Sequence, residues 1–222
     1  MKKSSKSRLT VKQLAVYPGD TLFARIARAV CRAGTLPAKE FYEAWEMARR
    51  VRRRYRGTRV VDMACGHGLL AHIMLLLDDS SPEALAVDTA IPLNAGRLSA
   101  ALCATWPRLR GRIHYIAAPL TDVALYPDDL VVSSHACGLL TDHIIERSIQ
   151  AGARLAVLPC CHDLGRSETG GLEGWVDGPL AVDLTRAARL RQAGYAVTTQ
   201  QIPREITPKN RLLLGHPNDR VR

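Results

Sequence analysis

The sequence predicts an α/β protein built on a mostly parallel β-sheet, and three observations indicate this class. The β-branched strand 60–63 leads through a turn of small residues into the apolar, helix-like segment 69–77. A second short apolar run, 84–88, ends in a carboxylate about twenty residues after that turn. Expected strands and helices then alternate along the rest of the chain, a pattern that places parallel strands in one sheet with helices on its faces.

The N-terminal quarter precedes this unit. Residues 1–12 are rich in Lys and Ser, so we expect a disordered tail. From Leu22 apolar residues recur at helical spacing, with Asp20 or Thr21 as the N-cap and Gly34 as the end. A second helix is expected over 38–55.

Beyond residue 88 the pattern predicts five further strands, at 112–117, 129–135, 154–159, 195–202 and 211–215, and helices at 92–105, 140–150 and 180–192. The connection between the last two strands is too short for a crossover helix. The last strand should therefore run antiparallel to its neighbour.

The turn after the first strand has the features of a nucleotide-binding loop. Gly66 and Gly68 leave room for a ligand against the backbone, and a helix N-terminus follows. Asp88 is placed to accept hydrogen bonds from both hydroxyls of a ribose. Ala64 stands where a dinucleotide fingerprint has its first glycine, which favours adenosine without a pyrophosphate and hence S-adenosylmethionine. The alternative is an ordinary strand–turn–helix unit.

Asp62-x-Ala64-Cys65-Gly66-x-Gly68 followed by Val87-Asp88 resembles motifs I and II of the class I methyltransferases. The resemblance implies a Rossmann-like seven-stranded sheet with an antiparallel last strand, preceded by a helical extension. We expect a basic tail and helical extension over 1–57 and the methyltransferase domain over 58–222. The expected contacts of S-adenosylmethionine are Asp62, Ala64, Cys65, Gly66, His67, Gly68, Asp88, Pro119, Leu120 and His135.

Histidine and cysteine gather at the ends of the fourth and fifth expected strands, as His135-Ala-Cys137-Gly and Cys160-Cys161-His. These elements resemble the family that contains the methyltransferase-like type 25 and ribosomal-RNA-adenine-dimethylase-domain-containing proteins. They are more distantly similar to the tRNA acceptor-stem 2′-O-methyltransferases. The likeness covers roughly residues 58–217, including Thr207-Pro-Lys-Asn-Arg211.

These residues suit three kinds of chemistry. His135 is the preferred candidate to position or deprotonate an acceptor hydroxyl, against a purely structural role for its side chain. Cys160 or Cys161, with Cys137, could instead act as in RNA 5-methylcytosine enzymes, where a thiolate attacks the base. Zinc could bind the three cysteines and one histidine, but no Cys-x₂-Cys pair is present and adjacent cysteines chelate poorly. We therefore expect no metal and no covalent adduct.

The charge is unevenly distributed. The chain of 222 residues carries a net charge of +10, and residues 1–59 hold 16 Lys/Arg and 4 Asp/Glu. This asymmetry predicts RNA as partner, or else a solvated basic face. The expected phosphate contacts close the second helix and are Arg49, Arg50, Arg52, Arg53, Arg54 and Arg56.

The remaining expectations concern the setting and the substrate. No apolar run approaches the roughly 18 residues that span a membrane, and six cysteines without a secretory pattern favour reduced thiols. We expect a cytoplasmic protein. Aromatic residues, at 5%, are few for stacking on RNA bases, so a protein or small-molecule substrate and a non-catalytic RNA-binding subunit stay as alternatives.

Overall fold

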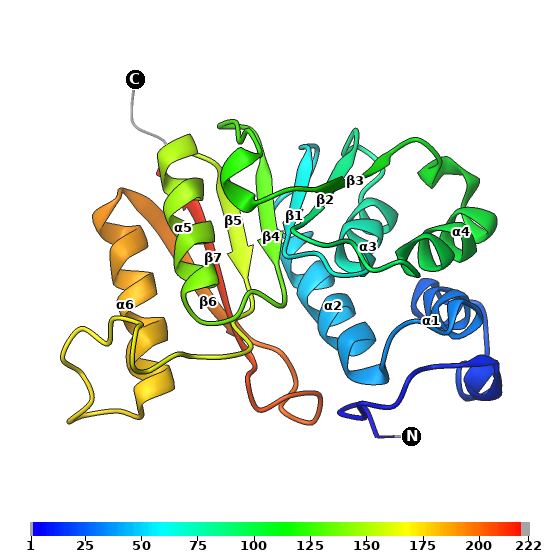
Figure 1. The fold of residues 1–222 in the computed structure, drawn as a ribbon, viewed down its shortest axis with the longest axis horizontal. Coiled ribbons are helices and arrows are strands. Elements are labelled where there is room, and N and C mark those ends of the chain that lie inside the picture. The colour runs from blue at the N-terminus through cyan, green and yellow to red at the C-terminus, as the bar shows by residue number, and fades with distance from the viewer. Residues whose placement is uncertain (1, 219–222) are drawn as a thin grey trace.

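The computed structural model describes residues 2–218, and in this part of the chain it forms one seven-stranded sheet (Figure 1). The strand order is β3-β2-β1-β4-β5-β7-β6. The strands are β1 Val60–Met63, β2 Ala84–Asp88, β3 Ile113–Ala117, β4 Leu130–Ser133, β5 Arg154–Val157, β6 Tyr195–Gln201 and β7 Arg211–Pro217.

The strand directions confirm the predicted fold class. Strands β1 to β5 pair in parallel, and β7 runs antiparallel to both β5 and β6. The order of the strands reverses between β1 and β4, because β1 has the earlier strand β2 on one side and the later strand β4 on the other. The loops that follow β1 and β4 therefore flank the crevice where ligands bind in open α/β sheets.

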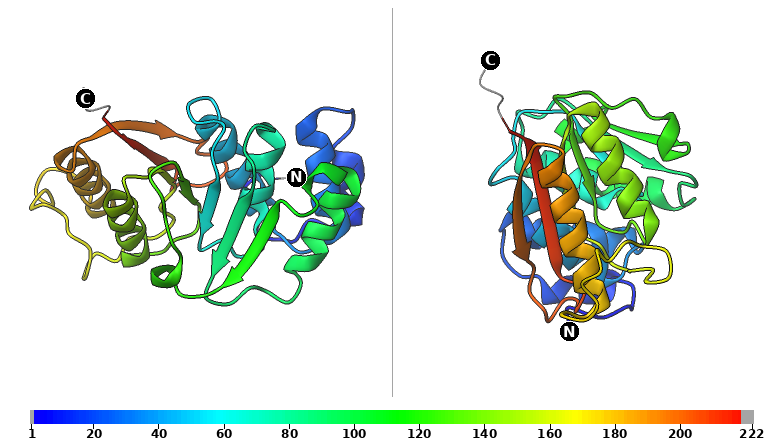
Figure 2. Two further views of the ribbon diagram at one scale, coloured as in Figure 1. Left: turned by 90° about the horizontal axis from the view of Figure 1, so that it is seen from above. Right: turned by 90° about the vertical axis from the view of Figure 1, so that its left-hand side faces the viewer.

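Helices cover both faces of the sheet (Figures 1 and 2). Alternate strand residues supply two apolar cores, with Val60 and Leu130 in one and Val61 and Val131 in the other. The first core packs against α1 Leu22–Ala33, α2 Ala38–Val51, α3 Leu69–Leu77 and α4 Ala95–Thr105. The second packs against α5 Leu139–Ala151 and α6 Gly178–Gln192. Short 3₁₀ turns are η1 Val11–Val16, η2 Pro107–Leu109 and η3 Leu120–Asp122.

The expectation of a disordered tail over residues 1–12 is wrong for residues 2–12, and Met1 lies outside the described residues. The Leu9 side chain is fully buried, and its N–H donates to the Leu36 carbonyl at 2.8 Å. Arg8 bridges to Pro37, and η1 begins directly after Thr10. One buried leucine and a short backbone pairing therefore order a segment whose composition alone indicated disorder.

Element boundaries differ from the predictions by a few residues. The second helix ends at Val51 where 55 was expected, and β4 and β5 end two residues earlier than predicted. Thr21, whose hydroxyl accepts the Ala24 N–H at 3.2 Å, is the N-cap of α1 in place of Asp20. In the described residues no helix is both long and apolar enough to cross a membrane.

Candidate active site

The glycine turn between β1 and α3 adopts a backbone that few residues tolerate. Gly66 and Gly68 have φ of 52° and 73°, and Ala64, at 56°, is the only non-glycine residue of the described chain with a positive φ. The turn is fixed by the Cys65 N–H, which donates to the Val87 carbonyl at 3.0 Å. Such strain in a well-ordered turn is typical of ligand-binding loops.

Asp88 lies at the end of β2 beside this turn. Its Oδ2 accepts the Gly66 N–H at 2.9 Å, while Oδ1 has only the Thr89 hydroxyl at 3.5 Å. One carboxylate oxygen thus holds the turn, and the other is available to a ligand. This arrangement fits a ribose whose hydroxyls donate to the acid.

Asp62 and His72 lie behind the turn. Asp62 is 1% exposed, and its Oδ2 accepts the Ala71 N–H at 3.1 Å. Burial raises the pKa of Asp62 to about 8. His72 shares a hydrogen bond with the Gly68 carbonyl at 2.7 Å, and burial lowers its pKa to about 4. Both side chains support the turn from within the protein core.

A small cavity joins the glycine turn to the end of β4. Its volume is about 40 Å³, far below the 300–1,000 Å³ of a typical ligand site. It is lined by Leu36, Glu40, Ala44, Cys65, Gly66, His67, Leu69, Leu70, Ser134 and His135. The first turns of α2 therefore cover the glycine turn, and side chains there have to move to admit a whole nucleoside.

Glu40 is a member of the site that the sequence did not reveal. Burial, followed by the nearby Glu43, raises the pKa of its carboxyl. Glu40 belongs to α2, which the sequence predicts only as an amphipathic helix. Its place in the site depends on how α2 packs over the glycine turn, and no sequence pattern indicates that packing.

His135 is brought together with the glycine turn as predicted. It follows β4 and lines the same cavity as Gly66. Burial, assisted by the charge of Lys39, lowers the pKa of His135 to about 4. The imidazole is therefore neutral near pH 7 and retains a nitrogen that can accept a proton.

Three other expected cofactor contacts have structural partners. The His67 Nε2 pairs with Asn94 Oδ1 at 2.9 Å, which orients the ring at the cavity wall. The Ala118 N–H donates to the Asp88 carbonyl, so Pro119 begins its loop beside the end of β2. The side chain of Leu120 is buried in the core that faces α5. Only the backbone of Leu120 is thus left to contact a ligand.

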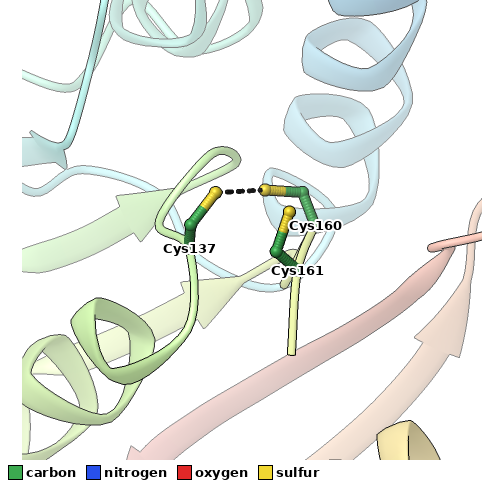
Figure 3. A group of neighbouring side chains, drawn as sticks. All are labelled: Cys137, Cys160 and Cys161. Atoms are coloured by element: carbon green, nitrogen blue, oxygen red, sulfur yellow. Dashed lines mark hydrogen bonds between the residues drawn. The ribbon is translucent and has the colours of Figure 1, made fainter. Parts of the chain in front are cut away.

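The three cysteines predicted at the strand ends converge (Figure 3). The Sγ atoms of Cys137, Cys160 and Cys161 all lie within 4.8 Å of one another, and those of Cys137 and Cys160 are 3.1 Å apart. Burial is the main cause that raises the pKa of both Cys137 and Cys160. A raised thiol pKa opposes covalent catalysis by Cys137 or Cys160, because that reaction requires a thiolate at neutral pH.

The arginines at the end of α2 do not act as one group. Arg52 is 2% exposed and pairs with Asp78 at 3.1 Å, so its expected contact with phosphate is wrong. Arg49 and Arg50 both pair with Glu46. Arg52 is thus held in a buried ion pair, and Arg49 and Arg50 are held in ion pairs within α2.

The other three arginines, Arg53, Arg54 and Arg56, are exposed and line an open groove of about 1280 Å³. The groove also contains Arg154, the first residue of β5, and His216 near the end of β7. It therefore lies at the edge of the sheet opposite the cavity. From Glu40 to Arg53 the chain advances about 20 Å along a helix, which sets the approximate separation of the two sites.

Comparison with known proteins identifies the family. A model of the methyltransferase domain matches residues 38–167. The chain belongs to this family of methyltransferases. The match begins at the start of α2, and the predicted division of the chain at residue 57 stays a prediction. No curated protein matches the sequence.

Solved methyltransferases share the fold. They include an O-methyltransferase family protein from Burkholderia thailandensis, with 17% identity over 92% of this chain and 62% of that chain and a TM-score of 0.51. The S-adenosylmethionine-dependent methyltransferase SibL in its apo form has 16% identity over 95% of this chain and 66% of that chain, with a TM-score of 0.53. M. capricolum TrmK in complex with S-adenosyl-homocysteine has 12% identity over 78% of this chain and 67% of that chain, with a TM-score of 0.50. This chain spans under two thirds of the length of the first two.

Because the chain belongs to a methyltransferase family, S-adenosylmethionine is its expected cofactor. The residues present fit it: Asp88 offers a free oxygen to the ribose, and no protein atom lies within 4 Å of a Cβ built on Gly66. The Glu40 carboxylate, in the same cavity, suits the ammonium group of the methionine part. When bound, the cofactor supplies an electrophilic methyl group.

Proposed function

We propose that this methyltransferase acts on RNA and transfers the methyl group to a hydroxyl. The observation that carries the proposal is the position of His135, a neutral imidazole in one cavity with Cys65 and Gly66 of the cofactor turn. Methyl transfer from a sulfonium requires the acceptor to be aligned closely with the methyl group. A hydroxyl acceptor also has to lose a proton, because its own pKa lies far above neutrality.

In this proposal the residues of the site have separate roles. The glycine turn and Asp88 hold the nucleoside, and Glu40 receives the ammonium group. His135 accepts a hydrogen bond from the acceptor hydroxyl and orients it. Because its lowered pKa makes it a weak base, it takes the proton late, when the new carbon–oxygen bond has made that proton strongly acidic and S-adenosyl-homocysteine leaves as a neutral thioether. Burial keeps His135 unprotonated over the whole neutral range, so it does not compete as a cation with the positively charged sulfonium. The resemblance to tRNA 2′-O-methyltransferases agrees with a ribose hydroxyl as acceptor.

The arginine groove supports RNA as the substrate class. Among residues 2–218, no carboxylate lines the groove or forms an ion pair with Arg53, Arg54, Arg56 or Arg154. Guanidinium groups without a carboxylate partner are suited to phosphate oxygens. Because the groove and the cavity are about 20 Å apart, a substrate that contacts both is an RNA of several nucleotides and not a mononucleotide.

Salt dependence of binding tests this proposal. Replacing Arg53, Arg54 and Arg56 together by Gln should weaken RNA binding and lower the slope of log K against log salt by about two to three. The control removes three exposed arginines elsewhere, Arg97, Arg110 and Arg191, and leaves the slope near the wild-type value. A groove variant with the wild-type slope would contradict the proposed RNA contact, and equal loss in both variants would indicate a general charge effect.

A further inference from the structure

The cysteine cluster has no part in the proposed methyl transfer and calls for its own explanation. Cys137 follows β4, and Cys160 and Cys161 follow β5, so the neighbouring strand ends bring them together. Consecutive residues of a regular strand point to opposite faces. Here Cys160 and Cys161 lie beyond the end of β5. The Cys160 sulfur points toward Cys137, and the Cys161 sulfur points toward that of Cys160 (Figure 3).

The spacing of the sulfurs fits a single metal ion. Zinc–sulfur bonds of about 2.3 Å in a tetrahedron put two sulfur ligands about 3.8 Å apart. The three Sγ atoms lie within 4.8 Å of one another, and those of Cys137 and Cys160 are 3.1 Å apart. Three neighbouring thiols form only weak hydrogen bonds with one another, whereas thiolates are strong ligands of soft cations.

Backbone contacts hold the two ligand segments in register. Cys137 and Cys161 form an isolated parallel bridge, and the Gly138 N–H donates to the Cys161 carbonyl at 3.3 Å. Main-chain pairing therefore holds the backbones of the two segments side by side, so that only the χ1 rotation of each cysteine decides where its sulfur lies. A site whose ligands are positioned before binding loses less entropy when a ligand arrives.

A buried polar network supports the same segments from the side of α5 and α6. Arg186, 1% exposed, donates to the Gly138 carbonyl at 3.0 Å and to both oxygens of Asp142. It also contacts Asp183, which in turn pairs with His162 at 2.8 Å. Gly138 and His162 directly follow the cysteines. This is the kind of outer shell that orients metal ligands in proteins.

We propose that Cys137, Cys160 and Cys161 bind one thiophilic divalent cation of the zinc class. The protein supplies three ligands, and Cys137 and Cys161 are exposed, so the fourth position opens to solvent at the carboxyl edge of the sheet. Three protein ligands with one open position is the arrangement of zinc sites that accept an exogenous ligand. The proposal replaces the expectation of no metal, which rested on the lack of a Cys-x₂-Cys pair and on the poor chelation expected of adjacent cysteines. Here the adjacent Cys160 and Cys161 bring both sulfurs within 4.8 Å of Cys137.

Metal analysis of the full-length protein tests the site without reference to activity. Protein expressed with zinc and purified without chelator should contain about one zinc per chain, and loading with Co²⁺ alone should give thiolate-to-cobalt charge-transfer absorption. Cys161→Ser, at an exposed position, should lose most of the metal. The matched control Cys103→Ser, half-buried and outside the cluster, should retain it.

Folding is checked by S-adenosyl-homocysteine binding, because the cofactor turn does not include these cysteines. If Cys161→Ser fails to fold, the wild-type cobalt spectrum and zinc content decide alone. Wild-type protein with less than about a tenth of an equivalent of either metal and three titratable thiols in the cluster would overturn the proposal. A disulfide between Cys137 and Cys160 in protein purified without reductant would overturn it equally.

Discussion

Gly68→Ala offers a quantitative test of how the glycine turn is held. Gly68 has φ of 73°, and a Cβ at this position would lie 2.9 Å from both Cε1 and Oη of Tyr115. A left-handed conformation costs a non-glycine residue about 1–2 kcal/mol. The tyrosine would also have to move, and its hydroxyl would lose the hydrogen bond that it donates to the His67 carbonyl at 2.8 Å, worth about 1 kcal/mol.

The free energy of unfolding should therefore fall by about 2–4 kcal/mol in Gly68→Ala, measured by urea denaturation without cofactor. Gly111→Ala is the matched control, since its φ is 71° and no atom lies within 4 Å of the added Cβ. The free energy of unfolding of this control should fall only by the cost of the left-handed conformation, about 1–2 kcal/mol. Equal losses in the two variants would refute the argument that Tyr115 packs against the turn.

Gly66→Ala separates stability from ligand binding. Its φ is 52° and its added Cβ would meet no protein atom within 4 Å, so its loss of stability should match that of Gly111→Ala. Because Gly66 lines the cavity, the methyl group should reduce the affinity for S-adenosyl-homocysteine, measured by calorimetry, by at least about tenfold. Unchanged affinity would remove Gly66 from the cofactor site.

Three further changes test other parts of the structure. Asp88→Ala should weaken cofactor binding by about 1–3 kcal/mol, and unchanged calorimetry would remove the ribose assignment. Between pH 6.5 and pH 4 His72 is neutral in the folded protein and protonated in the unfolded chain, so the free energy of unfolding should fall as the pH falls. His72→Gln should reduce the slope of this fall by up to about 1.4 kcal/mol per pH unit. Parallel stability curves would show that His72 titrates normally. Arg52→Met should cost about 3–5 kcal/mol of stability by leaving Asp78 without its buried partner, with no change in the salt slope of RNA binding in protein that folds.

Much of the fold could be predicted because its determinants are local. The strand, glycine turn and carboxylate over residues 60–88 specify a parallel sheet with a nucleoside site, and the short last connection sets the antiparallel direction of β7. Leu9 was missed because its burial depends on pairing with Leu36, a contact that no local pattern in a Lys/Ser-rich segment reveals.

Site residues that follow the ends of strands could be predicted from the sequence, whereas those on a helix that packs over the site could not. His135 and the cysteines could be placed from topology alone, since parallel strands end at one edge. Glu40 lies on a helix whose orientation across the sheet is set by tertiary packing. The run of arginines was obscure for the same reason. The C-cap position of α2 turns Arg52 inward to Asp78, and the turn after the helix leaves Arg53 and Arg54 in the groove.

Nucleoside mass spectrometry tests the central claim most directly. Purified protein would be incubated with deuteromethyl-labelled S-adenosylmethionine and RNA from a strain that lacks the gene, and the RNA digested to nucleosides. The account predicts a labelled 2′-O-methylnucleoside, with turnover reduced about 10²–10⁴-fold in His135→Ala while S-adenosyl-homocysteine binds as in the wild type. Label found only on bases or only in protein, or full turnover in His135→Ala, would contradict it.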